Sequence, residues 1–133
     1  MIGLDGAGKS SILYRLKNND FVKIGSTVGL NLETIHHNHL ELLMFDVGGK
    51  ARDLWSYYYE GLDALIFVID STDELRISIV KEEIARAIDT LKNNKYVILF
   101  YVNKQDAQKK MDMADVVRLL EIDDLEAGVD FII

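Results

Sequence analysis

The chain has 133 residues and a mass of 15.1 kDa, which is the length of one domain. With 49% hydrophobic and 28% charged residues it has the composition of a folded globular protein, so disorder as the main state is excluded. Its net charge of -7 argues against a broad phosphate-neutralising surface for nucleic acid. The absence of cysteine excludes disulfides, thiolate zinc sites and cysteine nucleophiles.

Nothing in the sequence indicates insertion into a membrane. The apolar runs, such as residues 65–69 and 97–102, are far shorter than the roughly 20 residues that span a bilayer. The start, Met1-Ile2-Gly3, has neither the basic residues of a secretory signal nor a glycine at position 2 for myristoylation. We therefore expect a soluble, intracellular protein without a transmembrane segment.

The first predicted element is a glycine-rich loop that leads into a helix. Successive backbone N–H groups of such a loop wrap a phosphate, assisted by the positive end of the helix dipole. Lys9 is expected to reach the terminal phosphates, and the Ser10 hydroxyl is expected to bind Mg²⁺. A glycine-rich turn that only caps a helix is the alternative. The loop satisfies the pattern G-x-x-x-x-G-K-[ST] with Gly3, Leu4, Asp5, Gly6, Ala7, Gly8, Lys9 and Ser10.

Residues 30–35 and 40–46 are predicted to form an antiparallel hairpin, because the connection between them is short and polar. The second strand ends at Asp46, and Val47-Gly48-Gly49 follows. An acidic residue at the tip of a strand can hold Mg²⁺, usually through water, and the glycines let the N–H of Gly49 approach a terminal phosphate. Taken alone, this segment is equally consistent with an ordinary turn.

Two further segments, residues 65–70 and 97–103, are continuously apolar, which is typical of strands buried on both faces. Helical patterns lie between and after them. Strands that alternate with helices of this length indicate parallel crossovers. The predicted fold class is therefore an α/β layered sheet, with ligands at the carboxyl ends of its strands.

Two helices are predicted in the second half of the chain. Residues 77–91 carry apolar side chains at steps of three and four, and Ser71 and Glu74 fit a capping box in front of them. A shorter apolar stripe over residues 113–120 predicts another helix, with Asp112 available as its N-cap.

Asn103-Lys104-Gln105-Asp106 directly follows the second apolar strand. A carboxylate in the plane of a purine can accept from both N1–H and the exocyclic amine of guanine, whereas adenine offers no such donor pair. Asp106 is therefore predicted to select guanine. Asn103 is expected to tie this loop to the phosphate loop, and Lys104 to lie over the base or the ribose. A polar loop without a ligand is the alternative.

At these residues the chain resembles the small GTPases, and within them the Arf and Arf-like (ADP-ribosylation factor) family. The matching stretches, residues 3–17, 26–34, 45–49 and 103–106, also agree in order and spacing. The resemblance implies a P-loop NTPase G domain over residues 1–133, three-layered, with a mostly parallel sheet and one antiparallel interswitch hairpin. It also implies a switch that binds GTP, GDP and Mg²⁺, hydrolyses GTP slowly and acts in vesicle or membrane trafficking.

The resemblance also assigns roles that local patterns leave open. Thr27 is implied to be the switch I threonine, which coordinates Mg²⁺ and the terminal phosphate only in the GTP state, and Ser11 to contact the α-phosphate. The implied catalytic set is thus Lys9, Thr27 and Gly49. An exchange factor, a GTPase-activating protein and effectors are implied to bind residues 21–35 and 46–59. The implied location is cytoplasmic, with peripheral attachment at the Golgi or other endomembranes.

The chain departs from the family pattern in three places. Lys50 follows Gly49 where the family has a glutamine that orients the attacking water, and an ammonium cannot accept a hydrogen bond from water. Either hydrolysis is very slow, or a piece of this segment has been left out. The start at Met1 leaves almost no first strand. Residues 125–132 resemble the start of the family's last helix, whereas residues 129–133 can be interpreted as the final strand; both interpretations leave the G domain incomplete.

Two other functions fit the motifs. A GTP-binding scaffold with negligible hydrolysis fits the missing glutamine. A P-loop kinase for a small metabolite would need a lid with catalytic arginines and would favour ATP, and the arginines of this chain form no lid-like group in the sequence. The aromatic cluster Trp55, Tyr57, Tyr58 and Tyr59 is interpreted equally well as internal packing or as an effector surface.

Overall fold

The computed structural model describes residues 1–18, 27, 29–37, 39–50, 52–91, 96–122 and 130–133. Helices and strands alternate in it as the sequence predicts for an α/β protein. In chain order the elements are α1 (Lys9–Asn18), β1 (Leu30–His37), β2 (Leu40–Val47), the 3-10 helix η1 (Arg52–Tyr58), β3 (Ala64–Asp70), the 3-10 turn η2 (Glu74–Arg76), α2 (Ile77–Leu91), β4 (Val97–Asn103), α3 (Met113–Leu120) and β5 (Asp130–Ile132).

The strands form a parallel unit and an antiparallel unit. β3 pairs in parallel with β4, and β4 pairs in parallel with β5. β1 and β2 form the predicted antiparallel hairpin, in a register that runs from Leu30 opposite Val47 to His37 opposite Leu40. The first residues lie between the two units, because Ile2 pairs with Phe67 of β3 and Val47 donates its N–H to Met1 O at 3.2 Å.

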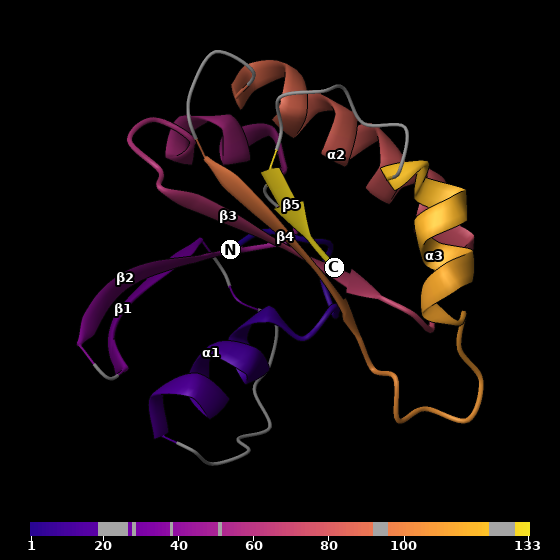
Figure 1. Cartoon of the computed structure of the whole chain (residues 1–133), viewed down its shortest axis with the longest axis horizontal. Helices are drawn as coiled ribbons and strands as arrows, with labels where there is room; N and C mark the ends of the chain where they lie inside the picture. The colour runs from indigo at the N-terminus through magenta and orange to yellow at the C-terminus, as the bar shows by residue number, and fades with distance from the viewer. Residues whose placement is uncertain (19–26, 28, 38, 51, 92–95, 123–129) are drawn as a thin grey trace.

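Helices lie on both sides of the strands, but they do not cover every strand completely. β3 is buried on both faces as predicted, whereas the same prediction is wrong for β4, since Val97 and Tyr101 on one of its faces are exposed. Figure 1 shows α1 on one side of the strands and α2 with α3 on the other. A large apolar core that includes Phe67, Phe100 and Val116 lies on the side of α2 and α3, and a smaller cluster of Leu13, Ile35 and Met44 lies under α1. The three-layered α/β fold is therefore confirmed.

The helix starts differ in part from the prediction. The expected capping box is wrong: Ser71 Oγ donates to Asn103 O at 2.7 Å, and Asp73 occupies the N-cap position of η2 without a side-chain capping bond. Ser71 follows β3 directly, so the carbonyl at the end of the neighbouring strand competes for its hydroxyl. Asp112 does occupy the N-cap position of α3, although its side chain makes no capping hydrogen bond.

The structure at the end of the chain decides between the helix and the strand that the sequence suggests there. Residues 130–132 form β5 against β4, as the final-strand interpretation requires. A helix over residues 125–132 is wrong for these last three positions, whereas residues 123–129 lie outside the described residues. β5 pairs with β4 because the apolar edge of β4 otherwise has unpaired backbone groups.

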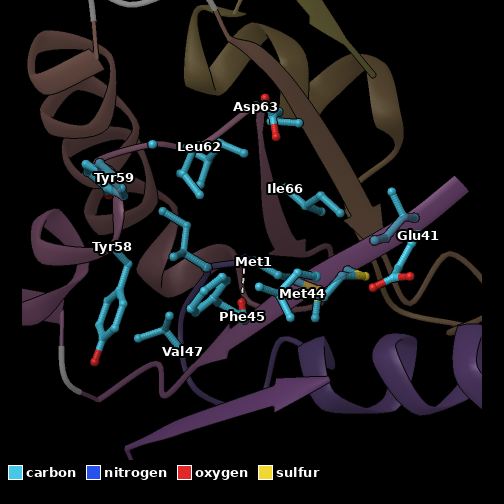
Figure 2. Close-up of a pocket in the computed structure, with 16 residues that line it drawn as sticks. Met1, Glu41, Met44, Phe45, Val47, Tyr58, Tyr59, Leu62, Asp63 and Ile66 are labelled. Carbon is cyan, nitrogen blue, oxygen red and sulfur yellow. Dashed lines mark hydrogen bonds between the residues drawn. The ribbon is translucent and has the colours of Figure 1, made fainter. Parts of the chain in front are cut away.

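A mainly apolar cavity of about 370 Å³ separates β2 from β3 next to the first residues. Figure 2 shows Met44 and Phe45 of β2 and Ile66 of β3 around it, with Leu62 and Tyr58 from the segment between the two strands. Beside this cavity, the first residues pair with β3 only through the isolated bridge between Ile2 and Phe67. In the part of the chain that the structure describes, no helix has both the length and the apolarity to cross a membrane.

Candidate functional site

The glycine-rich loop turns sharply between the start of the chain and α1. Gly3, Gly6 and Gly8 have positive φ angles of 142°, 78° and 95°, which side chains with a Cβ rarely adopt. α1 begins at Lys9, so its first N–H groups have no partner inside the helix and face the loop. The loop therefore presents main-chain donors and a helix N-terminus to one point, which suits an anion.

Lys9 points back into this loop rather than toward solvent. Its side chain is buried, and Nζ donates to Gly3 O at 2.9 Å and to Leu4 O at 3.2 Å. Burial lowers the pKa of Lys9, and the negative charges of Asp46 and Asp5 oppose that shift. An ammonium held among carbonyl groups with little solvent is suited to a phosphate oxygen, which provides a full negative charge in place of partial ones.

Ser10, Thr27 and Asp46 converge from three separate segments. Ser10 Oγ lies 2.6 Å from Thr27 Oγ1 and also bonds to Asp46 Oδ2. The Asp46 carboxylate has no solvent exposure, and among the described residues its Oδ1 has no hydrogen-bond partner. A fully buried carboxylate oxygen without a partner is costly, and a divalent cation would satisfy it. The donor set consists entirely of hard oxygens, which fits Mg²⁺.

The two glycines after β2 bring the backbone of this segment against the phosphate loop. A Cβ atom on Gly49 would lie 2.2 Å from Asp5 N, and one on Gly48 would lie 2.8 Å from Thr27 O. Gly48 also accepts a hydrogen bond from the Trp55 indole N–H at 3.3 Å. Larger residues would therefore separate the segment from the loop, so close approach to a bound phosphate depends on glycine here.

The loop after β4 contacts the phosphate loop through Asn103. Its Nδ2 donates to Ala7 O at 2.8 Å, which is the link that the sequence leads us to expect. Lys104 has a positive φ of 63°, and its Nζ bonds to Asp70 Oδ2 at the end of β3. Asp106, two residues further on, is exposed. A carboxylate that selects a base has to be accessible to the ligand, and Asp106 is.

Asp70 takes part in the site although its sequence pattern gave it no specific role. Partial burial raises its pKa, but hydrogen bonds from Lys104 and Thr72 outweigh this effect and hold the pKa of Asp70 below its ordinary value. The sequence feature that could have indicated a role for Asp70 is its position at the polar end of an apolar strand. The pairing of Asp70 with Lys104 spans 34 positions and depends on β3 and β4 being neighbours.

The segment after Gly49 has both buried and exposed aromatic side chains. Trp55 packs edge-to-face on Phe67 with ring centroids 6.0 Å apart, and Tyr59 is also buried. Tyr57, in contrast, is 77% exposed. Trp55 and Tyr59 thus belong to the core, and Tyr57 leaves a large aromatic surface available for contacts.

The requirement for glycine at position 8 gives a direct test of the loop geometry. A Cβ atom added to Gly8 would lie 2.3 Å from Asn103 Nδ2, on a residue whose backbone φ is 95°. We expect Gly8→Ala to lower stability by about 1–3 kcal/mol, the usual cost of such backbone strain, and to weaken GDP binding further. Thermal unfolding and GDP titration measure the two effects.

Gly61→Ala is the matched control for that substitution. Gly61 also has a positive φ, 75°, but its added Cβ would meet no atom within 4 Å. It therefore reproduces the backbone strain without the clash. Equal loss of GDP affinity in the two variants would contradict a specific contact between Gly8 and Asn103.

Comparisons with known proteins agree with this geometry. The model of the ADP-ribosylation factor family matches residues 1–132. ADP-ribosylation factors J and K of Dictyostelium discoideum are 47% and 45% identical over 130 residues, which cover 95% of this chain and 68% of each relative. Among solved structures, the Arl6 BBS3 small GTPase from Trypanosoma brucei, with the bound nucleotide analogue GppNp, is 35% identical and superposes with a TM-score of 0.89, over 99% of this chain and 81% of that one.

The family match extends over nearly the whole chain, and the superposition on the solved small GTPase covers 99% of it. Both the sequence identity and the superposition are far above the level at which only a fold is shared. The chain therefore belongs to the ADP-ribosylation factor family, whose members are GTPases that bind GTP or GDP together with Mg²⁺.

Proposed function

We propose that this chain is a guanine-nucleotide switch whose metal and terminal phosphate sites are built by Ser10, Thr27 and Asp46. The observation that carries the proposal is the contact among these three side chains, since residues 17 or more positions apart meet around a buried carboxylate oxygen. Thr27 precedes β1 and lies outside any helix or strand. A metal ligand on such a segment can report whether the third phosphate is present.

The remaining binding roles follow from the loop geometry. The N–H groups of residues 5–10 are proposed to hold the phosphates, with Lys9 on the terminal ones and Ser11, in the first turn of α1, on the α-phosphate. Asp106 is proposed to accept hydrogen bonds from guanine, and Lys104 to lie beside the base or ribose. The hydrogen bond from Asn103 to Ala7 supports this arrangement, because it links the base loop to the phosphate loop.

For hydrolysis, the residues of the chain would stabilise charge and position the phosphate. Bound Mg²⁺ would neutralise charge on the phosphate oxygens as water attacks in line with the leaving oxygen. Lys9 would hold the same oxygens from the loop side, and the N–H of Gly49 would donate to the terminal phosphate. Lys50, which follows Gly49, offers donors alone and cannot orient the water as an acceptor.

The identity of the bound nucleotide tests the proposal most directly. Nucleotide released from the purified protein is expected to be GDP or GTP by chromatography. Unlabelled GTP is expected to displace labelled GDP, and ATP at the same concentration is not. Displacement by ATP would support the metabolite-kinase alternative instead.

The missing acceptor after Gly49 predicts slow intrinsic hydrolysis. Loss of a group that positions the reacting water typically costs about 100-fold or more in rate, so we expect single-turnover GTP hydrolysis far slower than in a relative that has glutamine there. Cell extract is expected to accelerate it if a GTPase-activating protein supplies the missing group. An unchanged, negligible rate with extract would favour the GTP-binding scaffold.

Regulators and effectors are proposed to bind residues 21–35 and 46–59, of which residues 21–26, 28 and 51 lie outside the described residues. The exposed Tyr57 and the exposed apolar side chains of the hairpin, such as Leu32 and Leu43, support a protein-binding role for this side. A role in vesicle trafficking, in the cytoplasm and peripherally at Golgi or other endomembranes, is the corresponding cellular proposal.

A further inference from the structure

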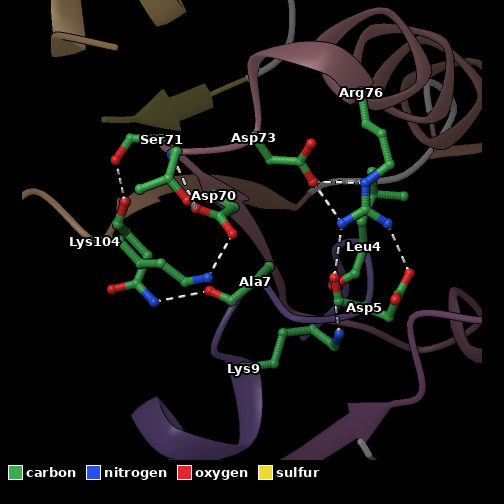
Figure 3. A network of polar contacts seen from close by, with 11 residues as sticks. Leu4, Asp5, Ala7, Lys9, Asp70, Ser71, Asp73, Arg76 and Lys104 are labelled. Atoms are coloured by element: carbon green, nitrogen blue, oxygen red, sulfur yellow. Dashed lines mark hydrogen bonds and ion pairs between the residues drawn. The ribbon is translucent and has the colours of Figure 1, made fainter. Parts of the chain in front are cut away.

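Arg76 joins the phosphate loop to the segment that leads into α2. Its Nη1 donates to Asp5 Oδ1 at 2.9 Å, and its Nη2 donates to the main-chain Asp5 O at 3.1 Å. Its Nε donates to Asp73 Oδ2 at 2.5 Å. Figure 3 shows the guanidinium between the two carboxylates, with Asp5 next to Leu4 in the loop. One side chain thus fixes both the carboxylate and the backbone of a loop residue 71 positions away.

Asp5 is an acidic side chain within a loop proposed to bind polyphosphate. It also lies beside Gly49, since a Cβ atom there would come within 2.2 Å of Asp5 N. Partial burial raises the pKa of Asp5, but the hydrogen bond and charge of Arg76 outweigh it and hold the pKa below its ordinary value. The carboxylate is therefore ionised at neutral pH and would repel a third phosphate unless a cation neutralises and orients it.

This pair lines a cavity together with Gly49, the residue proposed to contact the terminal phosphate. The cavity, of about 260 Å³, is lined by Asp5 and Gly49 on one side and by Arg76 on another. Lys50 and Arg52 also line it. Arg52 is paired with Glu83 at 3.2 Å, so its charge is already engaged within the protein.

We propose that Arg76 is a positioning residue for the terminal phosphate of GTP. It neutralises the Asp5 carboxylate, directs it toward η2 and holds Asp5 O, so that the phosphate loop can accept a third phosphate beside Gly49. This inference rests on the proposed function, because it concerns the same nucleotide site. The planar fork of arginine suits the task, since it donates to a carboxylate and to a carbonyl at the same time.

The test compares two nucleotides in a double-mutant cycle. Arg76→Ala leaves the Asp5 carboxylate unpaired, and we expect about 10-fold weaker binding of fluorescent GppNHp but less than about 3-fold weaker binding of fluorescent GDP, as for one charge pair near the surface. Adding Asp5→Asn removes the charge that Arg76 neutralises. We expect the double variant to recover GppNHp affinity to within about 3-fold of Asp5→Asn alone.

Each outcome of the cycle decides the inference. Equal loss for both nucleotides without recovery by Asp5→Asn would mean that Arg76 only anchors the start of α2, and unchanged affinity would mean that it is dispensable; both overturn the proposal. Selective loss of GppNHp without recovery also overturns it. Arg86→Ala is the control, because Arg86 lies on α2, pairs with Glu83 at 3.2 Å and is exposed.

The same titrations separate this inference from the proposed function. If the unmodified protein binds neither GDP nor GppNHp with Mg²⁺, the proposed nucleotide site is wrong. If it binds both and Arg76→Ala behaves like Arg86→Ala, the role of Arg76 alone is wrong. Thermal unfolding of each variant without nucleotide identifies any variant that fails to fold, and Arg76→Lys, which keeps the charge, is expected to retain more GppNHp affinity than Arg76→Ala.

Discussion

Lys9→Ala is expected to weaken GDP binding by about 100-fold, because hydrogen bonds from a charged group to phosphate oxygens contribute about 3 kcal/mol. Lys9 is buried at the start of α1 and its Nζ already lies among the loop carbonyls of Gly3 and Leu4. The ammonium therefore needs little rearrangement to meet a phosphate. Isothermal titration of each variant with GDP in the presence of Mg²⁺ measures the loss.

Lys17→Ala is the matched control for this loss. Lys17 belongs to the same helix, and its substitution removes the same charge. Lys17 lies at the opposite end of α1, however, where it pairs with Glu33 of β1. We expect Lys17→Ala to bind GDP within about 2-fold of the unmodified protein, as for a partly exposed ion pair away from the ligand. Comparable losses in the two variants would show that the overall charge, and not the position of Lys9, determines affinity.

Asp106→Asn is expected to exchange guanine for xanthine as the preferred base. The carboxylate of Asp106 accepts two hydrogen bonds from guanine in the proposed complex, and loss of this charged acceptor pair should reduce GDP affinity by about 100-fold. Xanthine carries a carbonyl where guanine has its exocyclic amine, so the amide N–H₂ of asparagine can donate to it. Titration with GDP and with xanthosine diphosphate measures the exchange.

Asp112→Asn controls for the change of charge near this end of the molecule. Asp112 is exposed, stands at the start of α3 and makes no side-chain capping bond. We expect it to leave the preference for GDP intact. If Asp106→Asn loses GDP affinity without gaining affinity for xanthosine diphosphate, Asp106 supports the loop and does not contact the base.

The strongest sequence predictions concern segments whose chemistry is local. The run from Gly3 to Ser10 indicates a phosphate loop because the glycines, the lysine and the following helix all lie within a few residues. The apolar run before Asn103 likewise indicates a strand with a polar loop at its end, although only the face that carries Ile98, Phe100 and Val102 is buried. The groups that form the phosphate loop are therefore neighbours in the sequence, whereas the burial of β4 depends on distant partners, since β4 pairs with β3 and β5.

The weaker predictions concern side chains with several available partners. Ser71 fits a capping box with Glu74, yet its hydroxyl donates to Asn103 O, a partner 32 positions away. The sequence shows that Ser71 is a hydrogen-bond donor but does not show that β4 ends beside it. The role of Arg76 was missed for the same reason, since its partner Asp5 lies 71 positions away in the sequence.

The sequence by itself determined which chemical groups this protein can offer to a guanine nucleotide, and in which order along the chain. The tertiary structure decided which of them meet: Ser10 with Thr27 and Asp46, Asn103 with Ala7, and Arg76 with Asp5. The physical reason is that a parallel sheet brings the carboxyl ends of distant strands to one edge, and the partners found there depend on strand order. Strand order is a property of the packed fold, which no local pattern of residues encodes.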